Sequence, residues 1–171
     1  TDSNANNYNP AATVDDGSCT TIICDNTLYT GPHTVTFTKP DGADWTLPQN
    51  RDSISPICEF TRGNTGGLVN FAVANFVQSF KVAMGTYNDV IGNYNNWNSW
   101  NNGNFQWQVG PQTDCGCMRC LAGHTITVHL VDDDLYFELY FHAWSFGGLG
   151  GFSYTRTLVC APVEVPLIYG C

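Results

Sequence analysis

The chain has 171 residues, of which 43% are hydrophobic and 13% aromatic, which is enough for one well-buried domain with a short appendage but a tight fit for two domains. A formal net charge of -9 and only 6 Lys and Arg residues argue against nucleic acid or an anionic membrane as a partner. Charged residues make up 12% of the chain, and Asn, Thr, Ser and Gly supply most of its polarity, which is typical of an extracellular protein.

Residues 1–23 form a small segment rich in Asp, Asn and Cys, and its first nineteen residues contain no apolar run. Such a segment cannot build a hydrophobic core, and a bound Ca²⁺ could replace one, because Ca²⁺ takes several oxygen ligands. The candidate ligands are Asp2, Asn4, Asn6, Asn9, Asp15 and Asp16. Gly17 permits a tight turn, and Cys19 could close it. The spacing is not that of an EF-hand, and the alternative is a disulfide-held loop with Asx turns.

Period-two alternation predicts strands from residue 33 onward. Residues 33–39 place Val35 and Phe37 on one face. Residues 66–84 favour two buried strands over a short helix followed by a strand, because β-branched and aromatic residues dominate. Residues 94–110 are rich in Asn and predict a long loop that leads into a strand at Phe105–Val109.

A β-hairpin is predicted over residues 124–144, where two alternating runs flank the turn sequence VDDDL. The first run turns Ile126, Val128 and Leu130 inward. The second run is expected to turn every odd-numbered residue from Leu135 to Ala143 inward and every even-numbered residue from Tyr136 to Trp144 outward. A further strand over 151–159 follows the glycine-rich bend GGLGG.

Many short strands with almost no helical pattern predict an all-β chain. We expect a β-sandwich, jelly-roll-like, over residues 24–162, with residues 1–23 as a small disulfide-clamped loop module before it. No apolar run approaches membrane-spanning length, so we expect no membrane insertion.

Eight cysteines, an even number, predict disulfides in an oxidising compartment and therefore a secreted or cell-surface protein. They are Cys19, Cys24, Cys58, Cys115, Cys117, Cys120, Cys160 and Cys171. The spacing does not determine which cysteines pair. The cluster CGCMRC at 115–120 is dense enough to suggest zinc, but no second pair stands at metal-ligand spacing, so a disulfide-rich loop is the preferred interpretation.

Three tryptophans stand among many asparagines in the loop 94–110, namely Trp97, Trp100 and Trp107. Aromatic faces stack on sugars and amides bind hydroxyl groups, so this composition indicates a candidate glycan site. Alternatively, the tryptophans pin the loop onto the sandwich or contact a protein partner.

The sequence does not predict an enzyme. It contains no G-x-S-x-G, H-E-x-x-H or P-loop pattern. His129 and His142 are expected side by side on the outer face of the hairpin, where they could bind a metal, although satisfied or solvated histidines are commoner. The acidic turn VDDDL could bind a cation, but an exposed turn is preferred. Arg62 and Arg156 are expected to pair with acids such as Asp52 or Asp132.

NANNYNPAATVDDGSC, at residues 4–19, resembles a short module scattered through secreted and cell-surface proteins of Bacteroidetes-type bacteria. That module usually opens with Gly-Cys, which this chain lacks at its start but carries at its end, in YGC. Joining the end to the start gives a complete copy. The resemblance therefore implies one period of a tandem array, in which residues 163–171 connect to the next module.

Residues 35–70 and 128–157 resemble two halves of a poorly characterised, non-enzymatic domain of large secreted bacterial proteins, whose second half tends to end in W…GGGFSYTR. Together the resemblances imply a structural repeat module of an extracellular adhesin, stalk or filament, stabilised by disulfides and calcium. Its expected partners are neighbouring copies, in a homo-oligomer or filament. The alternative is a carbohydrate-binding module that anchors a secreted protein to cell-surface glycan.

Overall fold

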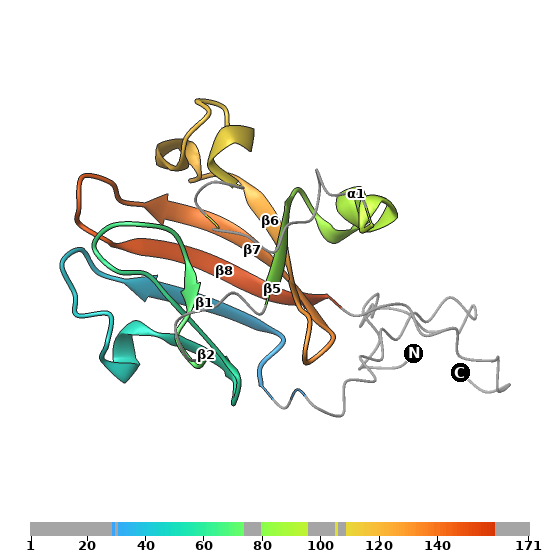
Figure 1. The fold of residues 1–171 in the computed structure, drawn as a ribbon, viewed down its shortest axis with the longest axis horizontal. Helices are drawn as coiled ribbons and strands as arrows, with labels where there is room; N and C mark the ends of the chain where they lie inside the picture. The colour runs from blue at the N-terminus through green and yellow to red at the C-terminus, as the bar shows by residue number, and fades with distance from the viewer. Residues whose placement is uncertain (1–28, 30, 74–79, 96–104, 106–108, 160–171) are drawn as a thin grey trace, which may run out of the picture. The chain divides into compact units, whose positions relative to one another are not determined.

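The computed structural model describes residues 29, 31–73, 80–95, 105 and 109–159 of the 171-residue chain. These residues belong to one compact unit, Leu28–Val159. Two antiparallel sheets hold most of its regular structure (Figure 1), together with the short helix α1 (Tyr87–Val90). The chain is therefore all-β, as the sequence predicts.

The larger sheet has the strand order β1-β8-β7-β6-β5, and every neighbouring pair is antiparallel. Its strands are β1 (Thr34–Lys39), β5 (Phe80–Met84), β6 (Thr125–Leu130), β7 (Leu135–Trp144) and β8 (Phe152–Val159). The first and last strands of the sandwich thus lie side by side.

The smaller sheet has three strands in the order β2 (Asp52–Ser55), β3 (Cys58–Thr61) and β4 (Val69–Asn70). It packs on the inner face of the larger sheet. The Phe60 and Phe80 ring centroids are 5.0 Å apart across the two layers, and Tyr154 donates a hydrogen bond of 2.8 Å to Asp52. Apolar side chains of both sheets fill the space between them, so the described unit is a β-sandwich.

The predicted hairpin is β6 and β7, with Leu130 opposite Leu135 and Val131–Asp134 as the turn. Asp134 has φ of 49°, a left-handed conformation that Asp tolerates better than most residues. Two carboxylates of this turn accept hydrogen bonds from other elements, Asp133 from Ser55 at 2.7 Å and Asp134 from His129 at 3.0 Å. The acidic sequence thus forms a turn that is bonded to the sandwich.

A β-bulge near the end of β7 overturns part of the predicted alternation. Phe141 lies opposite Tyr154, but Ala143 lies opposite Ser153, so β7 carries one extra residue at this point. The extra residue reverses the alternation beyond it. Ala143 is exposed and Trp144 is buried, the opposite of the prediction.

The two strands predicted within 66–84 correspond to β4 and β5, with residues 74–79 outside the described part. The strand predicted at Phe105–Val109 is wrong, because both of its described residues, Phe105 and Val109, are helical and buried. Their spacing of four places them on one face of a helix, a pattern that a five-residue window does not separate from alternation.

Candidate functional site

Several predicted site residues lie outside the described part of the chain. They include all six candidate calcium ligands, Asp2, Asn4, Asn6, Asn9, Asp15 and Asp16, and the candidate glycan residues Trp97, Trp100 and Trp107. Cys19, Cys24, Cys160 and Cys171 also lie outside it. These assignments stay predictions.

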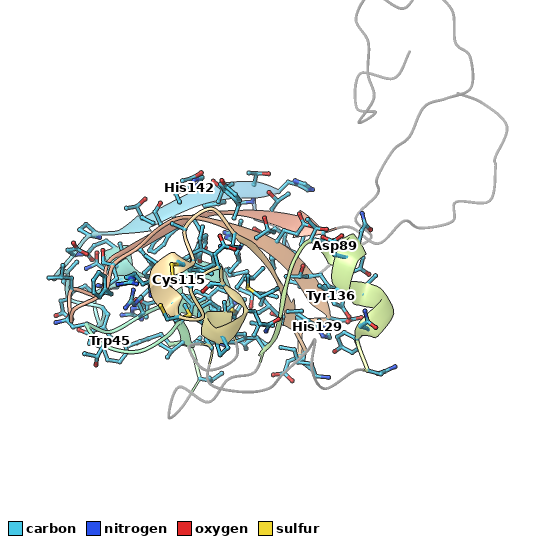
Figure 2. The ribbon with its side chains drawn as sticks, turned by 90° about the horizontal axis from the view of Figure 1, so that it is seen from above. Trp45, Asp89, Cys115, His129, Tyr136 and His142 are labelled. Atoms are coloured by element: carbon cyan, nitrogen blue, oxygen red, sulfur yellow. A yellow bond between two sulfur atoms is a disulfide. The ribbon has the colours of Figure 1, made fainter. Side chains whose placement is uncertain are left out.

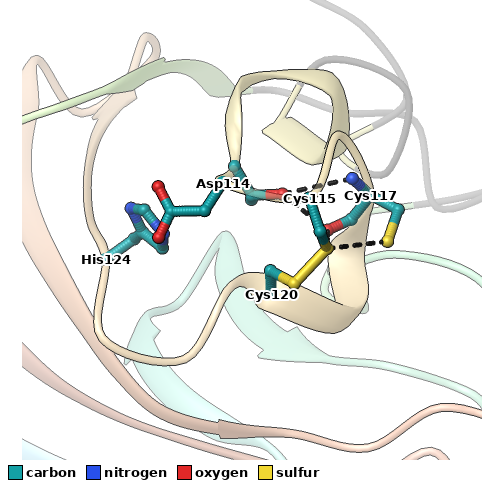
Figure 3. Close-up of a disulfide and its surroundings, with 6 residues drawn as sticks. Asp114, Cys115, Cys117, Cys120 and His124 are labelled. Carbon is teal, nitrogen blue, oxygen red and sulfur yellow. Dashed lines mark hydrogen bonds and ion pairs between the residues drawn. A yellow bond between two sulfur atoms is a disulfide. The ribbon is translucent and has the colours of Figure 1, made fainter.

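The remaining cysteine cluster forms a loop before β6 (Figure 3). Cys115 and Cys120 are joined by a disulfide with a Cα–Cα distance of 5.8 Å. The loop also holds the short 3₁₀ helices η4 (Gly110–Gln112) and η5 (Met118–Cys120). The disulfide removes two of the three thiolates that this cluster could offer to a zinc ion, so the structure favours the disulfide-rich loop over the zinc site.

Cys117 is the third sulfur of this loop and is a free thiol. Its Sγ lies 3.0 Å from Cys115 Sγ, while its side chain is half-buried. The backbone of Cys117 is fixed by Thr113, whose hydroxyl donates to the Cys117 carbonyl at 2.6 Å and accepts from the Cys117 N–H at 3.1 Å. The free thiol is therefore held beside the disulfide by hydrogen bonds.

A contact between His124 and Asp114 borders the same loop. His124, just before β6, has its Nε2 3.4 Å from the exposed Asp114 carboxylate, next to Cys115 in sequence. Because Asp114 is 88% exposed, this contact adds little to stability, but it ties the loop to the start of β6.

A second polar cluster lies under α1, on the outer face of the larger sheet. The His129 ring is buried and stacks on Tyr136, with centroids 4.1 Å apart. His129 Nε2 lies 3.0 Å from Asp134 Oδ1, and Nδ1 lies 2.5 Å from the Tyr94 hydroxyl. A carboxylate only accepts, so Nε2 carries the proton, and neutral Nδ1 accepts from Tyr94.

Burial lowers the pKa of His129, and the neighbouring Asp134 offsets this only in part. The imidazole is therefore neutral near pH 7. The Tyr94 hydroxyl donates to His129, and His129 donates to Asp134, so the three side chains form one continuous hydrogen-bonded series. The cluster fastens the segment after α1 to the sheet.

The predicted pairing of His129 and His142 on one patch is wrong. The register places Tyr136 opposite His129, whereas His142 lies beyond Tyr140 near the other end of β7. Figure 2 shows His129 and Tyr136 beside α1 and His142 well away from them. His142 is exposed and makes a 2.8 Å hydrogen bond with Thr155.

The prediction that Arg156 pairs with an acid such as Asp52 or Asp132 is confirmed, and the acid is Asp52. Arg156 Nε donates to Asp52 at 2.8 Å, and the side chains of Arg156 and Asp52 are 3% and 5% exposed. The Tyr154 hydroxyl donates to the same carboxylate oxygen. This buried, hydrogen-bonded pair joins the two sheets.

Arg62 does not follow the prediction of a paired acid. Its guanidinium donates to the carbonyls of Ser145 and Gly151 at 2.8 and 3.2 Å and stacks on Trp144, 3.9 Å from the ring centroid. Burial lowers its pKa to about 10, which still leaves it charged at neutral pH. Arg62 thus fixes the glycine-rich bend before β8.

No family model matches this chain, and no curated protein and no solved structure was found to be significantly similar to it. Among the described residues, no helix is long and apolar enough to cross a membrane.

The outer face of the larger sheet carries an open polar patch away from α1. Tyr140 is 45% exposed, and His142 and Thr36 are exposed near it. Hydroxyl groups on β1 and β8 pair across the strands, as between Thr36 and Thr155 at 2.7 Å. We call Thr36, Thr38, Tyr140, His142 and Thr155 the outer patch.

Proposed function

We propose that the chain is a structural repeat module of an extracellular adhesin, stalk or filament, whose sandwich is attached at one end only. The observation that carries this is the pairing of β1 with β8. Thr34, at the start of β1, lies opposite Thr157, near the end of β8. The strands that connect the sandwich to the rest of the chain therefore meet at the same end of the sheet (Figure 1).

A sandwich attached in this way supports a display role. Such an attachment would leave the end of the sheet away from Thr34 and Thr157, together with the outer patch, available to neighbouring copies or other partners. The buried Arg156–Asp52 pair and the Cys115–Cys120 disulfide support such a role, because both cross-link the unit internally. Secretion is proposed on composition and cysteine content.

Calcium in residues 1–23 belongs to the same proposal. A bound Ca²⁺ would raise the melting temperature of the full chain, because binding to the folded state stabilises it by mass action. Titration calorimetry and thermal melts, with and without chelator, test this. Unchanged melting and no binding heat would remove calcium from the proposal but leave the repeat architecture standing.

The intact mass of the material from its native source tests the array itself. A mass far above 18.8 kDa that persists after reduction, with TDSNANNYNP-like sequence after Cys171, is the expected result. A mass near 18.8 kDa, reduced or not, would contradict the tandem array.

Carbohydrate binding is a second candidate, because the outer patch combines an exposed aromatic ring with hydroxyl and imidazole groups on a sheet surface. Affinity electrophoresis in gels that contain soluble polysaccharides would reveal a retarded band. If the outer patch is the site, Tyr140→Ala should abolish the retardation. If the predicted loop is the site, Trp97→Ala, Trp100→Ala or Trp107→Ala should abolish it. Phe146→Ala is the matched control, because Phe146 is 62% exposed but lies in the bend before β8. No retardation of the wild-type chain would argue against the glycan role.

A further inference from the structure

The loop of Cys115, Cys117 and Cys120 has the parts of a reactive site. It presents a disulfide and a free thiol within six residues, in contrast to Cys58, which is free but 1% exposed. Cys115 is exposed, and Cys117 and Cys120 are half-buried, so partner molecules can reach the loop. We propose that these three cysteines form a thiol–disulfide exchange site that accepts a cysteine of a partner protein as a mixed disulfide.

The distance between sulfur atoms supports direct exchange. Cys117 Sγ is 3.0 Å from Cys115 Sγ, which is non-bonded contact with one atom of the existing disulfide. In Figure 3 the Cys117 sulfur lies on the side of Cys115 away from Cys120. Displacement at sulfur needs this arrangement, in which the attacking and leaving atoms flank the central one.

The loop backbone holds this arrangement in place. Gly116 adopts φ of 66°, a left-handed conformation that favours glycine, and its N–H donates to the Thr113 carbonyl at 2.9 Å. Thr113 also holds both backbone groups of Cys117. The contact between the thiol and the disulfide is thus set by a bonded turn, which raises the effective concentration of Cys117 at Cys115.

The exchange needs no oxidant. Cys117 attacks as the thiolate, a Cys115–Cys117 bond forms, and the Cys115–Cys120 bond breaks. Cys120 leaves as a thiolate, so the number of disulfides and thiols is unchanged. The freed Cys120 thiolate then attacks a disulfide of the partner. The Cys120 sulfur becomes bonded to one partner sulfur, and the other partner sulfur leaves as a thiolate.

Cys58 is the other free thiol among the described residues, and it lacks the exposure of the exchange site. Burial raises the pKa of the Cys58 thiol, and nearby acids including Asp133 raise it further. A buried thiol that resists ionisation is a poor nucleophile. Cys58 is therefore the internal control for reactivity within the same chain.

Arg119 allows a direct test, because it lies between Cys117 and Cys120. Trypsin cleaves there and produces peptides 82–119, with Cys115 and Cys117, and 120–156, with Cys120. A Cys115–Cys120 bond leaves the two peptides joined. A Cys115–Cys117 bond separates them and leaves Cys120 open to alkylation.

The full chain, produced under oxidising conditions, would be incubated near neutral pH with glutathione disulfide. The reaction would then be quenched with acid, free thiols alkylated with N-ethylmaleimide at mildly acidic pH, and the protein digested with trypsin. We expect both isomers, together with glutathione attached at Cys120. Cys117→Ser and Cys117→Ala should lose the Cys120 adduct completely, while near-UV circular dichroism reports that each variant folds. Cys58→Ala should leave the adduct unchanged.

Two results would overturn the proposal. The first is that peptides 82–119 and 120–156 stay joined throughout the incubation and that no glutathione is attached to Cys120. The other is a stable bridge between Cys117 and a cysteine outside residues 110–124. Neither result depends on whether the chain forms a tandem array.

Discussion

Asp52 joins the two sheets through two buried hydrogen bonds. It accepts from both Arg156 and Tyr154, and all three side chains are buried. Asp52→Ala would leave the Arg156 charge buried without its partner, so we expect a loss of about 3–5 kcal/mol in the free energy of unfolding. Urea denaturation measures this loss.

The matched control for Asp52 is Glu59, which pairs with Arg51 at 2.7 Å but is 27% exposed. Water screens this pair, so Glu59→Gln should cost about 1 kcal/mol or less. Equal losses for the two variants would contradict a dominant role for the buried pair.

His129 should make the stability of the fold depend on pH. Burial lowers its pKa below the ordinary value of 6.5, despite Asp134 on the adjoining turn, and Lys81 on β5 acts in the same direction as burial. The unfolded chain therefore binds a proton more readily than the folded one, and stability falls as pH decreases through 6.5 and levels off below the folded pKa. Above 6.5 this contribution is fully present.

Urea unfolding at about pH 7.5 and pH 5.5, a window in which histidines titrate, checks this expectation. His129→Gln should reduce the difference in unfolding free energy between the two pH values. His142→Gln, on the exposed part of the same sheet, should leave it as in the wild type. A wild-type chain that is equally stable at both values would contradict the assignment.

Among the elements, β7 offers the sharpest contrast between sequence pattern and structure. Strict alternation would bury Ala143 and expose Trp144, but the bulge does the reverse. Trp144→Ala should therefore cost about 3–5 kcal/mol, because it removes a buried ring that also stacks on Arg62. Ala143→Lys should cost no more than about 0.5 kcal/mol. Thermal and urea unfolding of both variants would measure this, and the reverse order of losses would argue against the bulge.

The strands were predictable where one face is buried and one is wet. In β1, Val35 and Phe37 are less exposed than the threonines between them, and β7 alternates in the same way as far as Phe141. In β6, by contrast, the outward residues Thr127 and His129 are buried as well. The bulge was not predictable, because an extra residue leaves the composition of a strand unchanged and only shifts its phase. Phe105 and Val109 were misassigned because two apolar residues four apart satisfy both periodicities.

The sites were less predictable than the strands, because they depend on pairing between distant segments. An acidic partner for Arg156 followed from the scarcity of basic residues, since a buried arginine needs an acid, but the sequence did not choose Asp52 over Asp132. The separation of His129 from His142 depends on hairpin register, which spacing along one strand does not give. The disulfide of Cys115 with Cys120 was one of many pairings that the sequence allows.

At the scale of the whole sandwich, one-ended attachment predicts a strong dependence of strength on the direction of force. Pulling between His33 and Val159 loads β1 and β8 at the same end, so their hydrogen bonds break one after another. Pulling between His33 and Gly148 loads the same two strands in shear, because Gly148 lies in the bend next to the opposite end. We expect clearly lower unfolding forces in the first geometry, measured by single-molecule pulling. Equal forces would contradict the β1–β8 pairing as the point of mechanical weakness.

The same pairing also sets the order of events when the chain folds. Thr36 and Thr155, which face each other on β1 and β8, are 119 residues apart in sequence. Because synthesis runs from the N-terminus, β1 is made long before β8, its neighbour in the described sheet. Closing so long a loop costs entropy before any hydrogen bond forms, and topologies of this kind fold slowly. The edge of the larger sheet is therefore completed late, and until then the nascent chain carries β1 as an unpaired, threonine-rich strand.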